Sequence, residues 1–454
     1  MPRVALCMIV KDAAATLEVC LESVREVVDE IVIADTGSTD STIALARKRG
    51  ARVVEIPWEN DFAAARNRAL AEVQADWVLV LDADEILDAS ASTAIPRLTA
   101  AKDVAGYQVT IRNYVHTLED RLWDQPATPN DSTLAAAKVF PAYVEHENVR
   151  LFRRDSRIYF VGRVHETVGG RIEKCGLRLG RATFLIHHFG LADDPETRAR
   201  KNRLYHDLGK KKVADVPLDA QAHLELGLVE LDNMGNAEEA LKCFQKACQL
   251  NPRLGVSWFF AGVAQMRLGK FADALANFEA AERKGRATAA TAEMIGDAHY
   301  NLGEFPDAAR CYEKALKLVR ESARIESKLG LAAVRAGKTE EGLRRILRSL
   351  AQEPALGELH DRLILALVWL DRIDEAAHAA ETKLRMVKGA PATDFVRAAS
   401  LWSKTGNWSR AVAVMHVGLR LYRDDAVLKR ALEELSANAG SKAEELLKAL
   451  SSSN

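Results

Sequence analysis

The chain has 454 residues, of which 48% are hydrophobic and 28% charged, and its formal net charge is −1. This length exceeds one hydrophobic core, so two or more domains are expected. The near-zero net charge gives no support to nucleic acid or an anionic membrane surface as the main partner. No apolar run reaches the roughly 18 residues of a membrane-spanning helix, so we expect no membrane span. The six cysteines include no C-x-x-C pair, which favours reduced thiols in a cytoplasmic protein.

The first 81 residues alternate between short apolar runs and helical patterns. Buried strands are predicted for residues 4–10, 30–34, 52–56 and 77–81. Helices are predicted between them, and Asp61 is a candidate N-cap for the helix at 61–74. The βαβαβαβ order predicts an α/β, Rossmann-like domain with a mostly parallel, doubly wound sheet.

Acidic residues follow two of these predicted strands. Asp35 follows the second strand, and Asp82 and Asp84 follow the fourth. Ligands of open α/β sheets bind beyond the carboxyl ends of the strands, where two such carboxylates can divide between a ribose hydroxyl and a divalent cation. A solvated acidic turn is the simpler explanation for a D-x-D motif taken alone. Residues 11–15 contain no glycine, which excludes a Gly-rich dinucleotide motif and a P-loop at this position.

Four motifs in this region occur together in a characteristic order. They are CMIVK at 7–11, ADTGSTD at 34–40, DFAAARN at 61–67 and LDADE at 81–85. Over roughly residues 1–205 the chain resembles family 2 glycosyltransferases of the GT-A fold. The closest resemblance is to the branch that carries C-terminal tetratricopeptide repeats and includes SunS-type peptide S-glycosyltransferases. The resemblance implies metal-dependent, inverting transfer of a sugar from a nucleotide-diphosphate sugar, with a UDP-sugar the expected donor.

The resemblance also implies roles for individual residues. The residues expected to bind the nucleotide sugar are Val10, Asp35, Arg66, Asn67, Asp82 and Ala83. Asp84 and His188 are expected to hold Mg²⁺ or Mn²⁺ against the diphosphate, and Glu166 of a G-R-V-H-E element is expected to be the general base. Each has a plainer alternative: Arg66 and Asn67 as the polar face of a helix, and His188 as a histidine hydrogen-bonded within the core.

The segment between the predicted strands and the G-R-V-H-E element is harder to interpret. Residues 107–111 alternate enough to predict a strand. Residues 123–148 contain three prolines and predict a long ordered loop. Because loops of that length inside a compact domain are usually functional, we expect it to form part of the acceptor pocket.

The C-terminal half shows a regular period. Gly235, Gly269, Gly303 and Gly337 are each 34 residues apart, Asp371 continues the period, and Gly406 follows after one inserted residue. Alanines and aromatics recur at fixed offsets from these glycines, a pattern typical of tetratricopeptide repeats. We therefore predict a catalytic domain at 1–215, ending in a linking helix, and a domain of about six repeats at 216–454 with a capping helix near 442–450.

The groove of such an array is a candidate site for an acceptor peptide, protein or glycan. In the second repeat, Val256, Phe259, Val263 and Met266 are predicted either to line this groove or to pack between repeats. Two other functions stay open: an interaction scaffold with an inactive transferase domain, and a polysaccharide-assembly transferase whose repeats recruit partner proteins. Retention of Asp35, Asp82, Asp84 and Glu166 favours an active enzyme, and association into a homodimer is left open.

Overall fold

The computed structural model describes residues 2–116, 121–122, 125–164, 166–190, 195–319 and 321–439. The chain forms two compact units, Met1–Asn236 and Ala237–Asn454. The domain boundary between residues 215 and 216 stays a prediction. His165 of the G-R-V-H-E element and the predicted capping helix at 442–450 lie outside the described residues.

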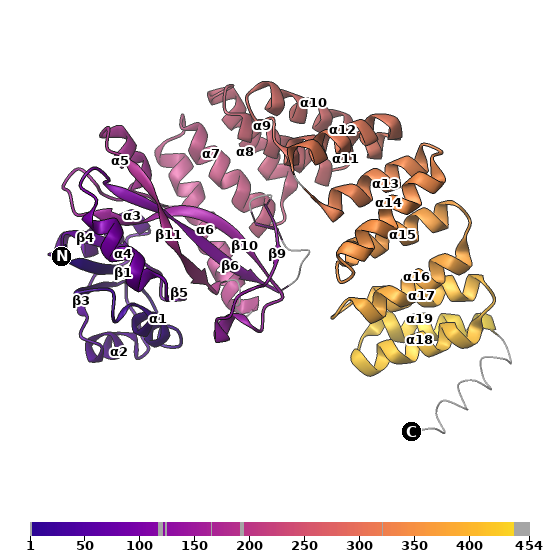
Figure 1. Ribbon diagram of the computed structural model, residues 1–454, viewed down its shortest axis with the longest axis horizontal. Helices are drawn as coiled ribbons and strands as arrows, with labels where there is room; N and C mark the ends of the chain where they lie inside the picture. Colours follow the sequence, from indigo (N-terminus) through magenta and orange to yellow (C-terminus); the bar gives the residue numbers. More distant parts are fainter. Residues whose placement is uncertain are drawn as a thin grey trace. The chain divides into compact units, whose positions relative to one another are not determined.

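The first unit is built on a mixed sheet (Figure 1). Its strands are β1 (Val4–Val10), β2 (Glu30–Asp35), β3 (Arg52–Glu55), β4 (Trp77–Val80), β5 (Glu85–Leu87), β6 (Gly106–Val115), β9 (Thr128–Pro129), β10 (Ala142–Arg153) and β11 (Leu179–His188). They are ordered β3-β2-β1-β4-β10-β6-β11-β5, with β9 beside β10, while β7 (Arg121–Leu122) and β8 (Gln125–Pro126) pair separately. As predicted, β3, β2, β1 and β4 are parallel; β10 runs antiparallel to both β4 and β6.

Helices cover both faces of this sheet. The helices of the unit are α1 (Leu17–Val24), α2 (Thr42–Lys48), α3 (Phe62–Glu72), α4 (Ala91–Ala100), α5 (Gly169–Lys174), α6 (Pro195–Asp215) and α7 (Ala220–Leu228), followed by a π-helical turn, η3 (Val229–Asn233). Leu6 of β1 packs in one core with Leu17 of α1, whereas Cys7 packs in the opposite core with Ala69 of α3. Successive residues of β1 therefore face different layers, and the carboxyl ends of β1, β2 and β4 meet at one edge of the sheet.

The prediction of a loop over residues 123–148 is wrong for the second part of this segment. β10 begins at Ala142 and pairs with β6, Ala142 lying opposite Val115. Ala142, Tyr143 and Val144, which come directly after Pro141, are all buried, so the start of this strand lacks the alternation of apolar and polar residues that would predict it. Before β10, a 3₁₀ turn, η1 (Ala135–Ala137), is anchored by Asn130, whose Nδ2 donates to the carbonyl oxygens of Ala137 and Phe140 at 2.8 Å. The strand predicted at 107–111 is confirmed within β6.

The second unit consists of consecutive helices (Figure 1). They are α8 (Ala237–Leu250), α9 (Gly255–Arg267), α10 (Phe271–Arg283), α11 (Ala289–Leu302), α12 (Phe305–Leu318), α13 (Ala323–Arg335), α14 (Thr339–Gln352), α15 (Gly357–Trp369), α16 (Ile373–Met386), α17 (Ala392–Lys404), α18 (Trp408–Leu421) and α19 (Ala426–Ala439). An ideal Cβ on Gly262 of α9 would lie 2.6 Å from the Phe278 ring of α10, so a glycine is needed for this close approach. Phe259 is 1% exposed, and the Arg286 guanidinium lies over its ring. Of the two roles predicted for Phe259, the structure therefore supports packing and not lining of the groove.

The 34-residue period marks turns that need left-handed backbone. The φ angles of Gly235, Gly269, Gly303, Gly337 and Gly406 lie between 68° and 85°, and Asp371 has a φ of 58°. Glycine adopts this conformation without a steric penalty, whereas most residues with a Cβ do not. Asp371 thus keeps the turn of its repeat at a conformational cost.

Asp371→Gly is therefore expected to stabilise the repeat array by roughly 1 kcal/mol, because it removes the left-handed penalty at an exposed position. The midpoint of urea unfolding, followed by circular dichroism, measures the effect. The reverse change at the equivalent turn, Gly337→Asp, serves as the matched control and should lower the midpoint. A lower midpoint for Asp371→Gly would show that its side chain makes a compensating interaction.

Candidate active site

Asp35 is a buried carboxylate at the end of β2, opposite Val10 of β1. Its side chain is 1% exposed, and Oδ1 accepts hydrogen bonds from the backbone N–H groups of Gly37 and Ser38 at 2.9 and 2.8 Å. Oδ2 is buried and has no partner among the described residues. Since buried polar atoms are normally paired, Oδ2 is suited to accept a donor from a ligand. Val10 itself is buried, and its carbonyl oxygen accepts from Thr36.

Arg66 joins two acidic residues from different parts of the chain. It lies on α3 and is 6% exposed, which excludes the alternative of a solvated helix face. Nη2 donates to Asp82 Oδ1 at 2.6 Å, and Nε donates to Glu166 Oε1 at 2.5 Å. Nη1 is buried without a partner among the described residues. One guanidinium thus brings Asp82 and Glu166, 84 residues apart in the sequence, to the same site.

Arg150 of β10 provides a second buried cation. Its Nη2 lies 2.8 Å from Oε1 of Glu85 and 3.4 Å from Oδ2 of Asp82. Burial acts to raise the pKa of Asp82, but Arg66 and Arg150 together hold it well below its usual range. The sequence reasoning missed Arg150; the available signal was a single arginine inside the apolar run V-R-L-F, where an unpaired charge is rarely found.

Asp84 and His188 face each other beside this pair of arginines. Asp84 Oδ2 lies 3.6 Å from His188 Nε2, and the Asp84 carbonyl oxygen accepts the N–H of Phe189 at 3.1 Å. Burial acts to lower the pKa of His188, but the Asp84 carboxylate outweighs it and raises the pKa above its ordinary value. Asn113 Oδ1 lies 2.8 Å from His188 Nδ1. These contacts show that His188 belongs to the polar site and is not merely bonded to the core backbone.

The donor set of Asp84 and His188 fits a divalent cation that also binds a phosphate. A cation such as Mg²⁺ is commonly held by one or two carboxylates together with substrate phosphates and water, and imidazole suits transition metals. Within the described ranges, no group of three or more His, Cys, Asp or Glu side chains could hold a metal ion. Asp82, the other acid of the D-x-D motif, is already engaged by the two arginines.

Glu166 and Asn67 occupy defined positions next to Arg66. Glu166 is 12% exposed, and none of the described residues donates to its second oxygen, Oε2. Asn67 donates to the carbonyl oxygen of Phe160 at 3.0 Å and accepts its N–H at 2.9 Å. Asn67 therefore anchors the segment that leads to Glu166. Ala83 is half-buried between the two aspartates.

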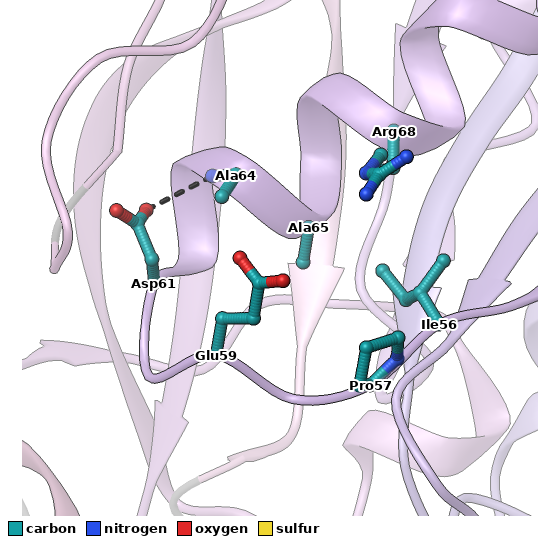
Figure 2. Close-up of a pocket in the computed structure, with 7 residues that line it drawn as sticks. All are labelled: Ile56, Pro57, Glu59, Asp61, Ala64, Ala65 and Arg68. Atoms are coloured by element: carbon teal, nitrogen blue, oxygen red, sulfur yellow. Dashed lines mark hydrogen bonds between the residues drawn. The ribbon is translucent and has the colours of Figure 1, made fainter.

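A hollow at the start of α3 continues this edge of the sheet (Figure 2). It is lined by Ile56, Pro57, Glu59, Asp61, Ala64, Ala65 and Arg68. Asp61 Oδ1 accepts the N–H of Ala64 at 2.9 Å, which confirms the predicted N-cap of the helix. Ile56 donates its N–H to the Asp35 carbonyl oxygen at 2.9 Å, so the hollow adjoins the Asp35 strand end.

Both parts of the chain match models of known families. Residues 5–158 match the model of glycosyl transferase family 2. The N-terminal part is a family 2 glycosyltransferase domain. Residues 220–254, 261–303 and 293–356 match tetratricopeptide repeat models, so the C-terminal part is a repeat array, as the 34-residue period predicts.

Curated relatives match parts of this architecture. The chain is 32% identical to an uncharacterized glycosyltransferase of Rickettsia felis over 24% of this chain and 38% of that protein. It is 24% identical to the SPbeta prophage-derived glycosyltransferase SunS of Bacillus subtilis over 36% of this chain and 34% of that protein. A TPR repeat-containing protein of Synechococcus elongatus is 50% identical over 21% of this chain and 24% of that protein. The chain thus spans 24–38% of these relatives' lengths.

One aromatic side chain of the glycosyltransferase domain escaped the sequence reasoning. Tyr205 of α6 packs against Phe62 of α3, with ring centroids 6.0 Å apart. Burial raises the pKa of Tyr205 to about 12, and the nearby carboxylates of Asp82, Glu166 and Asp84 add to the effect. A tyrosine within a basic helical stretch carries no recognisable motif, so only the fold places it beside the acidic residues.

Across the described ranges, every helix is too short or too polar to cross a membrane.

Gly190→Ala is expected to lower activity of the glycosyltransferase domain by about 10²-fold, because misplacing catalytic groups by about 1 Å has that effect. An ideal Cβ at this position would lie 2.5 Å from His188 Nε2 and 2.7 Å from Asp84 Oδ2, which forces the two side chains apart. Initial rates of nucleotide-sugar consumption measure the loss. Gly170→Ala is the matched control, since its Cβ would meet no atom within 4 Å. Equal rates for the two variants would contradict a functional Asp84–His188 pair.

Proposed function

We propose that this protein transfers a sugar from a nucleotide-diphosphate sugar, with a UDP-sugar as donor, to a nucleophilic acceptor by a metal-dependent, inverting displacement. The observation that carries the proposal is the convergence of the Asp84–His188 pair with the Arg66-bridged carboxylates of Asp82 and Glu166 at one sheet edge. Sugar transfer needs a site for a diphosphate leaving group and a base for the acceptor, and these residues supply both kinds of group.

The nucleotide is bound by buried polar groups, two of which, Asp35 Oδ2 and Arg66 Nη1, have no partner among the described residues. Asp35 Oδ2 accepts from the base or ribose, and Asp82, just after β4 at the same edge of the sheet, accepts from a ribose hydroxyl. Val10, Ala83 and the segment that Asn67 anchors are proposed to contribute to the nucleotide site. Arg66 Nη1, buried and unpaired among the described residues, donates to the nucleotide sugar.

Asp84 and His188 would hold the cation, Mg²⁺ or Mn²⁺. When bound, the cation stabilises the negative charge on the departing diphosphate. Glu166 Oε1 stays fixed on Arg66, so Oε2 takes the proton from the acceptor as its nucleophile attacks the anomeric carbon. Because the nucleophile attacks from the face opposite the diphosphate, the configuration at that carbon inverts.

The repeat array is proposed to bind the acceptor, a peptide, protein or glycan. The alternative is an array that recruits partner proteins for polysaccharide assembly, and a screen of acceptors would distinguish the two.

We also propose a cytoplasmic location. All six cysteines are free, in keeping with that location.

Calorimetric titration of UDP with and without MnCl₂ tests the proposed function. Wild-type protein should bind UDP more tightly with Mn²⁺, and Asp84→Ala should lose this increase because one of the two cation ligands is gone. Asp103→Ala, which changes an acid that is 70% exposed, should behave as wild type. Unchanged Mn²⁺ dependence in Asp84→Ala would overturn the metal assignment. Binding without hydrolysis of any UDP-sugar would favour the inactive scaffold instead.

A further inference from the structure

A buried asparagine connects the proposed cation site to the interior of the sheet. Asn113 lies on β6, opposite His188 of β11 and Val144 of β10, and is 2% exposed. Its Oδ1 is 2.8 Å from His188 Nδ1. Its Nδ2 is 3.0 Å from the carbonyl oxygen of Val144 and 2.8 Å from Nδ1 of His146. Each end of the amide therefore has a polar partner.

The Val144 carbonyl decides which way this amide points. A backbone carbonyl oxygen can only accept a hydrogen bond, so the group facing it must be the Nδ2 amine. The second Nδ2 hydrogen then points to His146, which accepts it on Nδ1. Rotating the amide by half a turn would set its oxygen against the Val144 oxygen and leave a buried acceptor unpaired. Such an unpaired group is costly, so the orientation is fixed.

The fixed amide in turn sets the proton on His188. Asn113 Oδ1 is an acceptor, so His188 must carry a hydrogen on Nδ1 to complete the 2.8 Å contact. A neutral imidazole has one N–H, and Nε2 is then left with a lone pair. Nε2 is the nitrogen that faces Asp84, at 3.6 Å. The lone pair thus points to the place where the proposed cation would bind.

We propose that Asn113 is a positioning residue that holds His188 in the Nδ1–H form, with Nε2 free to bind the divalent cation. The inference rests on the proposed function in that it assigns His188 to the cation. Outer partners of metal-bound histidines commonly change metal affinity by about 10–100-fold when they are replaced. Asn113→Leu removes the acceptor for Nδ1–H and should weaken Mn²⁺-dependent UDP binding by that factor.

Two substitutions at position 113 separate positioning from packing. Asn113→Asp keeps an oxygen against His188 Nδ1 but sets its other oxygen against the Val144 carbonyl, so it should destabilise the fold while retaining Mn²⁺ affinity close to wild type. Asn113→Leu should lose the affinity, and His188→Ala should lose it as well. Thermal unfolding of each variant is measured alongside the titration. Loss of affinity in both Asn113 variants would reduce the residue to a packing role and overturn the proposal.

A second readout needs no metal. In full-length protein labelled with ¹⁵N-histidine, the ¹⁵N shifts of His188, assigned by comparison with His188→Ala, should report a protonated Nδ1 at alkaline pH, where the neutral ring is populated. Asn113→Leu should shift His188 to the Nε2–H form. An Nε2–H form in wild type overturns the proposal whatever the metal titration shows. An Nδ1–H form combined with UDP binding that ignores Mn²⁺ overturns the proposed metal site instead and leaves the positioning of His188 standing.

Discussion

Glu166→Gln is expected to lower sugar transfer by about 10²–10⁴-fold, the contribution usual for general-base catalysis. The amide keeps an oxygen to accept from Arg66 Nε, so the link to Asp82 through Arg66 survives. The variant cannot take the acceptor's proton, and its link to Arg66 becomes a hydrogen bond to a neutral amide. UDP affinity should stay near wild type, and kcat should fall with little change in KM for the donor. Coupled assays of UDP release with a saturating acceptor measure both constants.

The control for this experiment is another carboxylate of the same domain. Glu147 of β10 is 37% exposed and has no resemblance to a family motif, so Glu147→Gln should retain wild-type activity. If Glu166→Gln transfers sugar at the wild-type rate, Glu166 serves only as an ion-pair partner of Arg66. In that case the acceptor is either deprotonated by another group or already ionised, as a thiolate would be.

Arg150→Met is expected to destabilise the glycosyltransferase domain by about 3–5 kcal/mol, the usual effect of removing one partner of a buried ion pair. Arg150 is the cation 2.8 Å from Glu85, whose side chain is 1% exposed. Methionine fills much of the same volume, so the loss comes from the uncompensated carboxylate and not from a cavity. Chemical unfolding followed by the fluorescence of the buried Trp77 measures the free energy of unfolding.

This loss should depend on pH. Burial raises the pKa of Glu85 from 4.5 to about 7, and the Arg150 guanidinium opposes this rise. Between these values the folded state holds the proton more tightly than the unfolded state, so this group makes the free energy of unfolding fall as pH rises. Without Arg150 the pKa of Glu85 should rise further. Below about pH 6 Glu85 is protonated in both folded proteins, so the gap between wild type and Arg150→Met should stay constant there. It should widen as pH rises through about 7, where only wild type loses the proton.

The double variant Arg150→Met with Glu85→Gln provides the control. It removes the cation and the buried negative charge together, so most of the lost stability and of its pH dependence should return. A pH-independent gap in the single variant would show that Glu85 is not the source of the destabilisation.

The sequence alone was sufficient to predict those elements whose pattern repeats and those strands that are buried on both faces. The four parallel strands were predicted within one or two residues, because a short apolar run between turn signals has few other stable uses. The repeat array followed from the 34-residue spacing, since each turn needs left-handed backbone that glycine supplies. The Asp61 N-cap and the acids at the ends of β2 and β4 were also readable, because each depends on local chemistry only.

Only the tertiary structure decided how the site is assembled. Arg66 meets Glu166 across 100 residues, Arg150 meets Glu85 across 65, and Asn113 meets His188 across 75. Such contacts depend on strand order and register, which local patterns do not encode: β10 enters between β4 and β6, although its first half looked like a loop. A buried arginine or asparagine in a strand has no local signature. Its partner, and hence its role, exists only once the sheet has brought distant strands side by side.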